Sequence, residues 1–109
     1  MKLVLVIVNP DDADTLVRLL LQAEFRVTKI KTVGGFLREG NLTLLIGAED
    51  EQVPKILELV EENCRRRVRQ VQPLPPPVEG IDVFIPMPVE VEVGGATVFV
   101  LPVEGVYRF

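Results

Sequence analysis

The stretch FRVTKIKTVGGFLREGNLTLLI, residues 25–46, decides the expected fold, because it contains two strand-like segments joined by a glycine-rich loop. In the first segment, residues 25–33, side chains alternate with the period of a β-strand. Phe25 and Val27 share one face of this segment, and Arg26, Thr28 and Ile30 share the other. The second segment, residues 42–46, is a short apolar run typical of a buried strand. The sequence therefore predicts two consecutive strands with a short loop at residues 34–41.

The loop itself, GGFLREGN, combines three glycines with side chains suited to a nucleotide. Glycines let the backbone come close to a ligand and expose its N–H groups. Phe36, Arg38 and Asn41 supply a ring for stacking, a guanidinium for phosphate and a carboxamide for a base edge. An ordinary glycine-rich turn explains the glycines equally well. No Gly-Lys-Ser/Thr follows them, so the loop is not a P-loop.

The segments on either side of this stretch predict one strand and two helices. The apolar run at residues 2–8 favours a buried strand, and Asn9 followed by Pro10 is typical of a helix start. That helix is expected to end near residue 23. Apolar residues at helical spacing predict a second helix over residues 50–66, with Pro54 in its first turn.

The carboxyl-terminal third is read as a long loop followed by two strands. Residues 72–88 contain six prolines and predict the loop. Strands are expected at residues 88–93 and 96–103, with Gly94-Gly95 as a tight hairpin turn between them. The order predicts a single α+β domain over residues 1–109, a ferredoxin-like β-α-β-β-α-β sandwich with an extra strand. Because residues 98–101 are apolar on both strand faces, we expect oligomerisation through the sheet.

Composition narrows the classes of function. A net charge of −4 argues against a general nucleic-acid or anionic-membrane surface. The chain has no histidine, which removes a Ser-His triad and an ordinary zinc site, and no carboxylate pair has a distinctive spacing. We therefore expect no catalytic residues, no metal and no cofactor. The single cysteine, Cys64, is expected to be a buried thiol in a reducing compartment. The apolar run at the amino terminus is short and lacks a signal-peptide pattern, so we expect a cytoplasmic protein.

Three consecutive arginines, Arg65, Arg66 and Arg67, follow the second predicted helix. Positive charges at this end compensate the helix dipole on a solvated face. An anion-binding role is the alternative reading.

Taken together, these motifs resemble the PII-like cyclic di-AMP receptor family of bacterial signal-transduction proteins. The matching stretches are the opening strand, FRVTKIKTVGGFLREGN and PMPVEVEVGGATVFVLPVEGVYRF, which together span nearly the whole chain. The resemblance implies a homotrimer that binds cyclic di-AMP in clefts between subunits and signals through loop rearrangement. It also implies a short first loop and a long second loop, as at residues 34–41 and 72–88.

Carried onto this sequence, the resemblance implies a ligand site formed by two subunits. One subunit would contribute Arg26, Thr28, Gly35, Phe36, Leu37, Asn41 and Gly47, and its neighbour Phe99 from the closing hairpin. The pattern departs in two places: Glu24 stands where relatives can carry a neutral amide, and Arg108 where a glutamine can occur. A carboxylate at position 24 would repel the ligand's phosphates, whereas Arg108 would strengthen their binding.

Two other functions remain open on the sequence. A PII-like trimer could prefer ATP or another adenine nucleotide, although the loop at residues 34–41 has no lysine for a γ-phosphate. A ligand-free trimeric scaffold could use the proline-rich segment to hold a protein partner. The downstream partner is not specified by any motif in the sequence.

Overall fold

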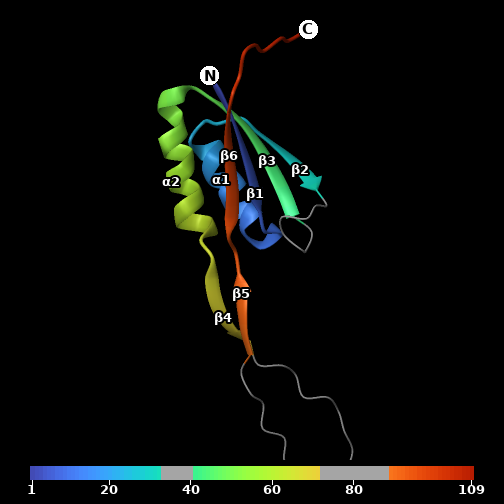
Figure 1. The fold of residues 1–109 in the computed structure, drawn as a ribbon, viewed down its shortest axis with the longest axis vertical. Coiled ribbons are helices and arrows are strands. Elements are labelled where there is room, and N and C mark those ends of the chain that lie inside the picture. Colours follow the sequence, from blue (N-terminus) through green and yellow to red (C-terminus); the bar gives the residue numbers. More distant parts are fainter. Residues whose placement is uncertain (33–40, 72–88) are drawn as a thin grey trace, which may run out of the picture.

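The computed structural model describes residues 1–32, 41–71 and 89–109, and these residues form two helices and six strands (Figure 1). In chain order the elements are β1 Lys2–Val8, α1 Pro10–Gln22, β2 Val27–Thr32, β3 Asn41–Ala48, a 3-10 turn Asp50–Gln52, α2 Val53–Cys64, β4 Arg67–Val71, β5 Val89–Val93 and β6 Ala96–Pro102. The predicted loops at residues 34–41 and 72–88 lie outside the described residues, except that Asn41 opens β3.

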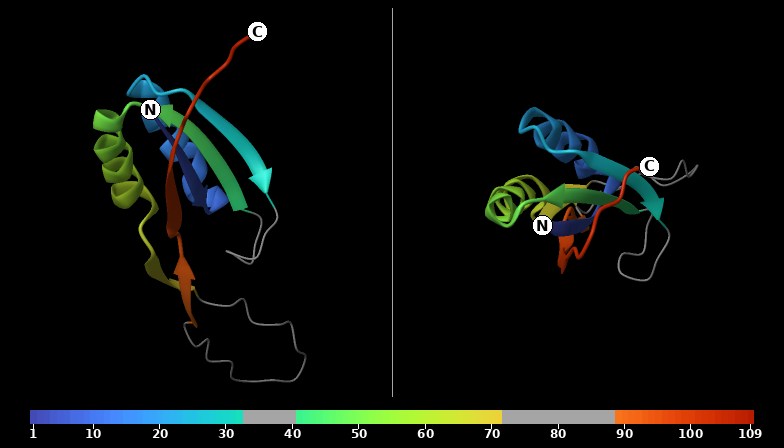
Figure 2. Two further views of the ribbon diagram at one scale, coloured as in Figure 1. Left: turned by 45° about the horizontal axis from the view of Figure 1, so that its top comes forward. Right: turned by 90° about the horizontal axis from the view of Figure 1, so that it is seen from above.

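Four strands form the main sheet in the order β2-β3-β1-β6, and every neighbouring pair is antiparallel. Both helices lie on the same side of this sheet (Figure 2). The predicted α+β order and the two-layer arrangement are confirmed. The strands β2 and β6 are the two edges of the sheet.

The helix starts follow the local sequence. The Asn9 side chain accepts a hydrogen bond from the Asp11 N–H at 3.0 Å, and Pro10 occupies the first helical position, where a missing N–H costs nothing. Pro54 lies in the first turn of α2, as expected. The second helix ends at Cys64, two residues earlier than predicted, because Arg65 adopts an extended ψ of 140°.

The core lies between the helices and one face of the sheet. Alternate residues of β1 and β3 point into it and are fully or almost fully buried; they are Val4, Val6, Val8, Leu44, Ile46 and Ala48. The helices contribute Leu16, Leu20 and Ile56, which are also fully buried. Each such side chain contributes roughly 1.5–3 kcal/mol on burial. The helix period of 3.6 is visible in the sequence, whereas residues 3–8 are apolar at every position, so the fold decides which face of β1 joins the core.

The remaining two strands form a separate two-stranded sheet that extends beyond the core; we call it the ribbon (Figure 1). Its first strand, β4, was not predicted, because Arg67 was assigned to the helix end. Its second strand, β5, pairs with β4 rather than with β6. The predicted hairpin at Gly94-Gly95 is therefore wrong: the chain passes there from the ribbon into the main sheet, where β6 pairs with β1.

Cys64 is fully buried at the end of α2, as its helical spacing predicted. Burial raises the pKa of its thiol to about 11; the negative charge of Asp12 acts in the same direction, and the positive charge of Arg67 opposes it. Because the thiolate is the nucleophilic form, Cys64 is a structural residue and not a reactive one.

The turn between α1 and β2 explains the backbone at Glu24. The N–H of Phe25 donates to the Leu20 carbonyl, and the N–H of Glu24 donates to the Leu21 carbonyl, both at 3.0 Å. This pair of backbone hydrogen bonds is the Schellman motif at the end of a helix. The motif needs one residue in the left-handed conformation, and glycine is favoured there. Glu24 occupies that position with a φ of 68°.

Replacing Glu24 by glycine should therefore raise the free energy of unfolding by about 1 kcal/mol, since the left-handed strain is removed. Chemical denaturation of the purified variant checks this. The matched control is Glu58→Gly within α2, which should lower stability by about the same amount because glycine is a poor helix former. An equal loss of stability in both variants would contradict the strain argument.

Candidate functional site

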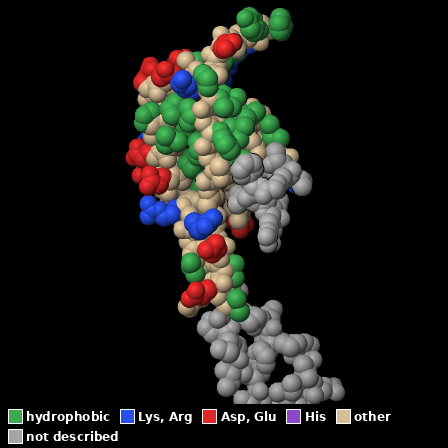
Figure 3. All heavy atoms as spheres, viewed as in Figure 1, with side chains coloured by type: hydrophobic (Ala, Val, Ile, Leu, Met, Phe, Trp, Pro, Cys, Tyr) green, Lys and Arg blue, Asp and Glu red, His purple; other side chains and the backbone are tan. Residues whose placement is uncertain are grey.

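The face of the main sheet opposite the helices, which we call the open face, carries mostly apolar side chains together with three threonines and a glycine. Its members alternate with the core residues along the strands; they are Leu3, Leu5, Ile7, Thr28, Ile30, Thr43, Leu45, Gly47, Thr97, Phe99 and Leu101. In Figure 3 hydrophobic side chains gather over this sheet. Phe99 and Leu101 are 38% and 43% exposed. An apolar surface of this kind needs a partner.

Three of the predicted site residues lie close together at one edge of this face. Thr28 on β2 pairs with Leu45 on β3, so Gly47 lies two residues along β3 from the partner of Thr28. Arg26 directly precedes β2, and both Arg26 and Thr28 are exposed, as their alternation with buried Phe25 predicted. A guanidinium, a hydroxyl and a residue without a side chain are thus brought together at the β2 edge.

Nothing among the described residues requires position 47 to be glycine. Its φ lies outside the left-handed region, and an added Cβ would meet one atom, the Met1 Cε, at an ordinary 3.8 Å. The position is exposed. A missing side chain on an exposed strand favours close approach of something outside the chain.

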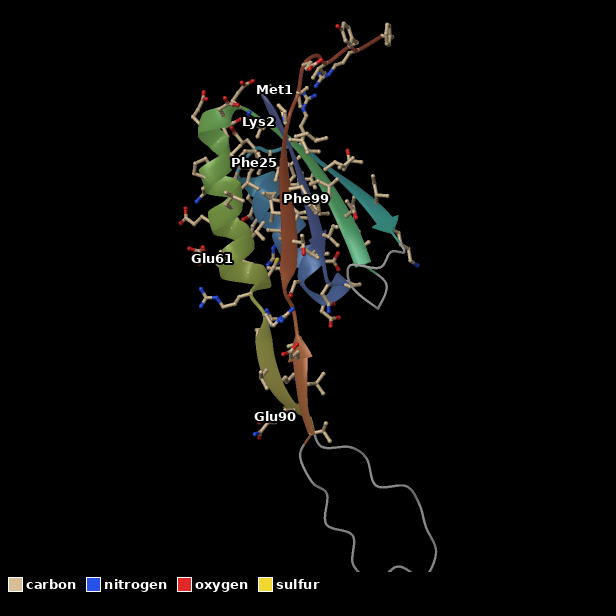
Figure 4. All side chains as sticks on the ribbon, in the orientation of Figure 1. Met1, Lys2, Phe25, Glu61, Glu90 and Phe99 are labelled. Carbon is tan, nitrogen blue, oxygen red and sulfur yellow. The ribbon has the colours of Figure 1, made fainter. Side chains whose placement is uncertain are left out.

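Phe99 lies on the same face but at the opposite edge of the sheet. Leu5 pairs with both Phe99 and Leu45, and Leu45 pairs with Thr28, so two strands separate Phe99 from Thr28. At about 4.8 Å per strand spacing, this distance is roughly 14 Å. Within one chain, therefore, Phe99 does not join Arg26 and Thr28, although the strand pairing places it on the same face as Thr28. Figure 4 labels Phe99 on β6.

The remaining predicted site residues are placed less completely. Gly35, Phe36 and Leu37 lie outside the described residues. The backbone of Asn41 opens β3 opposite Thr32. Arg108 is exposed in the tail that follows β6, where the neighbouring Tyr107 is 81% exposed. The described residues therefore bring three of the predicted site residues, Arg26, Thr28 and Gly47, near the β2 edge.

A groove of about 540 Å³ lies elsewhere, between α2 and β6. Its walls include Val60, Cys64 and Val98, with Arg65 and Arg66 at its rim. None of the predicted site residues that the structure describes lines it. The groove borders β6 and shares Thr97 with the open face.

The structure also contains a polar pair that the sequence analysis missed. Arg67 Nη2 donates to Asp12 Oδ1 at 2.8 Å, although the two residues are 55 positions apart. The Asp12 side chain is 9% exposed. Arg67 thus begins β4 and binds a carboxylate of the chain itself, instead of lying on a solvated helix end.

In residues 1–32, 41–71 and 89–109, no group of three or more metal-ligating side chains is present. Over the same residues, no helix has both the length and the apolar character needed to cross a membrane.

Comparison with known proteins identifies the group to which this chain is related. A crystal structure of a functionally unknown protein from Pediococcus pentosaceus is 40% identical, with a TM-score of 0.79 over 99% of this chain and 96% of the other. A family model described as a cyclic-di-AMP receptor matches residues 1–109. The full-length match confirms the resemblance seen in the sequence, and the chain belongs to the cyclic-di-AMP receptor family.

Proposed function

We propose that this protein is a non-enzymatic cytoplasmic sensor, a homotrimer that binds cyclic di-AMP in clefts between its subunits and signals by loop rearrangement. Membership of the receptor family over the full length of the chain is the observation that carries the ligand assignment. The open face and the position of the predicted residues on it support the oligomer and the cleft.

The trimer is supported by the chemistry of the open face. Leu3, Leu5, Ile7 and Leu45 form a half-buried apolar centre, and Phe99 and Leu101 extend it to the β6 edge. Placing three such faces against one another removes these side chains from water. At about 25 cal/mol per Å² of apolar area, this burial drives the association.

The cleft between subunits is supported by the separation of the site residues along the sheet. Arg26, Thr28 and Gly47 lie at the β2 edge, whereas Phe99 lies at the β6 edge. A cyclic assembly brings unlike surfaces of adjacent subunits together. The β2 edge of one subunit would then meet Phe99 of the next, and each cleft would receive residues from two chains.

The individual side chains suit the parts of the ligand. Arg26 and Thr28, two residues apart on one strand face, supply a cation and a hydroxyl to one phosphodiester. Phe36 would stack on an adenine, and Asn41 would pair with an adenine edge. Gly35 and Leu37 would present backbone N–H groups, Gly47 would admit the purine, and Arg108 would add positive charge from the tail. The ordering of loop residues by the ligand would change the surface offered to a downstream protein.

Isothermal titration calorimetry tests the proposal directly. Cyclic di-AMP is expected to bind with saturation near one ligand per subunit. ATP with magnesium and cyclic di-GMP are the controls, and neither should produce saturable heat. Preferential binding of ATP would favour the alternative adenine-nucleotide sensor, and no binding of any nucleotide would favour a ligand-free scaffold.

A further inference from the structure

The ribbon is joined to the core through a narrow base. Two short connections lead into it, Arg65-Arg66 before β4 and Gly94-Gly95 after β5. Among the described residues, β4 and β5 make their main contacts with each other (Figure 1). An isolated two-stranded ribbon is at best marginally stable in water. Contacts at the base therefore decide whether the ribbon keeps its place.

Side chains and backbone from four segments meet at this base. We call Asp12, Cys64, Arg67, Gly94 and Gly95 the ribbon-base cluster. Arg67 Nη2 donates to Asp12 Oδ1 at 2.8 Å, and its Nη1 donates to the Arg65 carbonyl at 3.3 Å. The Gly95 N–H donates to the Cys64 carbonyl at 2.7 Å. Arg67, the first residue of the ribbon, thus binds the first turn of α1 through Asp12.

The two glycines allow this close fit. Gly94 has a φ of 80° and Gly95 a φ of 93°, a conformation that residues with side chains rarely adopt. A Cβ on Gly94 would lie 2.7 Å from the Arg65 carbonyl and 3.0 Å from Asp12 Oδ2. The backbone of residue 94 therefore packs directly against the Asp12–Arg67 pair.

The second carboxylate oxygen of Asp12, Oδ2, makes the Asp12–Arg67 pair sensitive to the loss of Arg67. Asp12 is 7% exposed, and its Oδ2 is buried without a hydrogen-bond partner among the described residues. Arg67 supplies the positive charge next to this carboxylate, and its own pKa is raised by the hydrogen bond to Asp12 and by the Asp12 charge. Without Arg67, a buried carboxylate would have no partner and would have to reach water. The simplest way to reach it is to move the ribbon away.

We propose that the Asp12–Arg67 pair holds the ribbon on the core, so that breaking this pair releases the ribbon while the main sheet and helices stay folded. The ribbon then has a docked state, with Gly94 closed over Asp12, and a released state, with the carboxylate in water. The inference concerns the ligand-free protein and does not depend on which nucleotide binds.

Residue-resolved hydrogen exchange by NMR on the ligand-free full chain tests this device. In Arg67→Met, the amides of Val68, Gln70 and Gly95 should exchange at least tenfold faster than in the wild type. Amides of the core strands β1 and β3 should keep their wild-type rates. The matched control is Arg69→Met, two residues along the same ribbon face, because Arg69 makes no ion pair within the described residues.

Two outcomes would overturn the proposal. Wild-type exchange in Arg67→Met would mean that the pair does not hold the ribbon, and equal acceleration in β1 and β3 would mean that it only adds general stability. A second variant, Asp12→Asn, removes the charge with little change of shape, and it covers the case in which Arg67→Met does not fold. Asp12→Asn should accelerate the same ribbon amides, and wild-type rates there would also overturn the proposal.

Discussion

Replacing Leu5 by aspartate should convert the proposed trimer into a monomer. Leu5 lies at the centre of the open face, between Phe99 on one neighbouring strand and Leu45 on the other. In the proposed trimer, the new carboxylate would be buried against apolar side chains of adjacent subunits, at a cost of several kcal/mol. In the monomer it would keep contact with water, because position 5 is only half-buried there and the helices cover the other face of the sheet (Figure 2).

Sedimentation equilibrium measures this change directly. The wild-type protein is expected at three times its chain mass of 12.2 kDa, and the Leu5→Asp variant at the chain mass itself. The control Leu21→Asp makes the same chemical change on α1, where the side chain is 56% exposed, and should remain trimeric. A monomeric wild type would contradict the trimer, and a trimeric Leu5→Asp would show that subunits associate through another surface.

Local sequence patterns predicted the helices and strands whose structure depends on residues close together in the sequence. The apolar run of β1, the alternation in β2 and the Asn9-Pro10 helix start depend on neighbouring residues, and the structure has these elements as expected. The ribbon depends instead on pairing across residues 72–88, which no local pattern specifies. For the same reason Gly94-Gly95 looks like a hairpin turn in the sequence, although it joins two separate sheets.

In the candidate site, too, some placements follow from the local sequence and others depend on residues far apart in the chain. The strand period places Arg26 and Thr28 on the exposed face, and the structure confirms this placement. The distance between Thr28 and Phe99 depends on strand order, which the alternation does not contain. The Asp12–Arg67 pair joins residues 55 positions apart, and Arg67 was first interpreted by its place at a helix end. The available signal was Asp12, whose carboxylate stands among the apolar residues of the first helix. A carboxylate buried in such a place needs a cation as its partner.

Replacing Arg26 by alanine should weaken cyclic di-AMP binding by roughly ten- to hundredfold without dissociating the trimer. A hydrogen bond between the guanidinium and a phosphodiester is charge-assisted and contributes about 1.5–3 kcal/mol. Arg26 is exposed at the start of β2, and Phe25, whose burial holds that end of the strand, is unchanged in the variant. Titration calorimetry gives the affinity, and sedimentation gives the subunit number.

Lys29 provides the matched control, because it is a cation on the same strand that points to the opposite face. Its Nζ lies 3.3 Å from Asp14 Oδ1 of α1, and both side chains are substantially exposed, so the pair contributes at most about 1 kcal/mol to stability. Lys29→Ala lowers the net positive charge of the strand as much as Arg26→Ala does. If ligand attraction came only from overall charge, both variants would lose affinity equally, which would contradict the site. A loss of affinity confined to Arg26→Ala means that the open-face side of β2 meets the phosphate. The reason is that alternation along the strand places the two cations on opposite faces of the sheet.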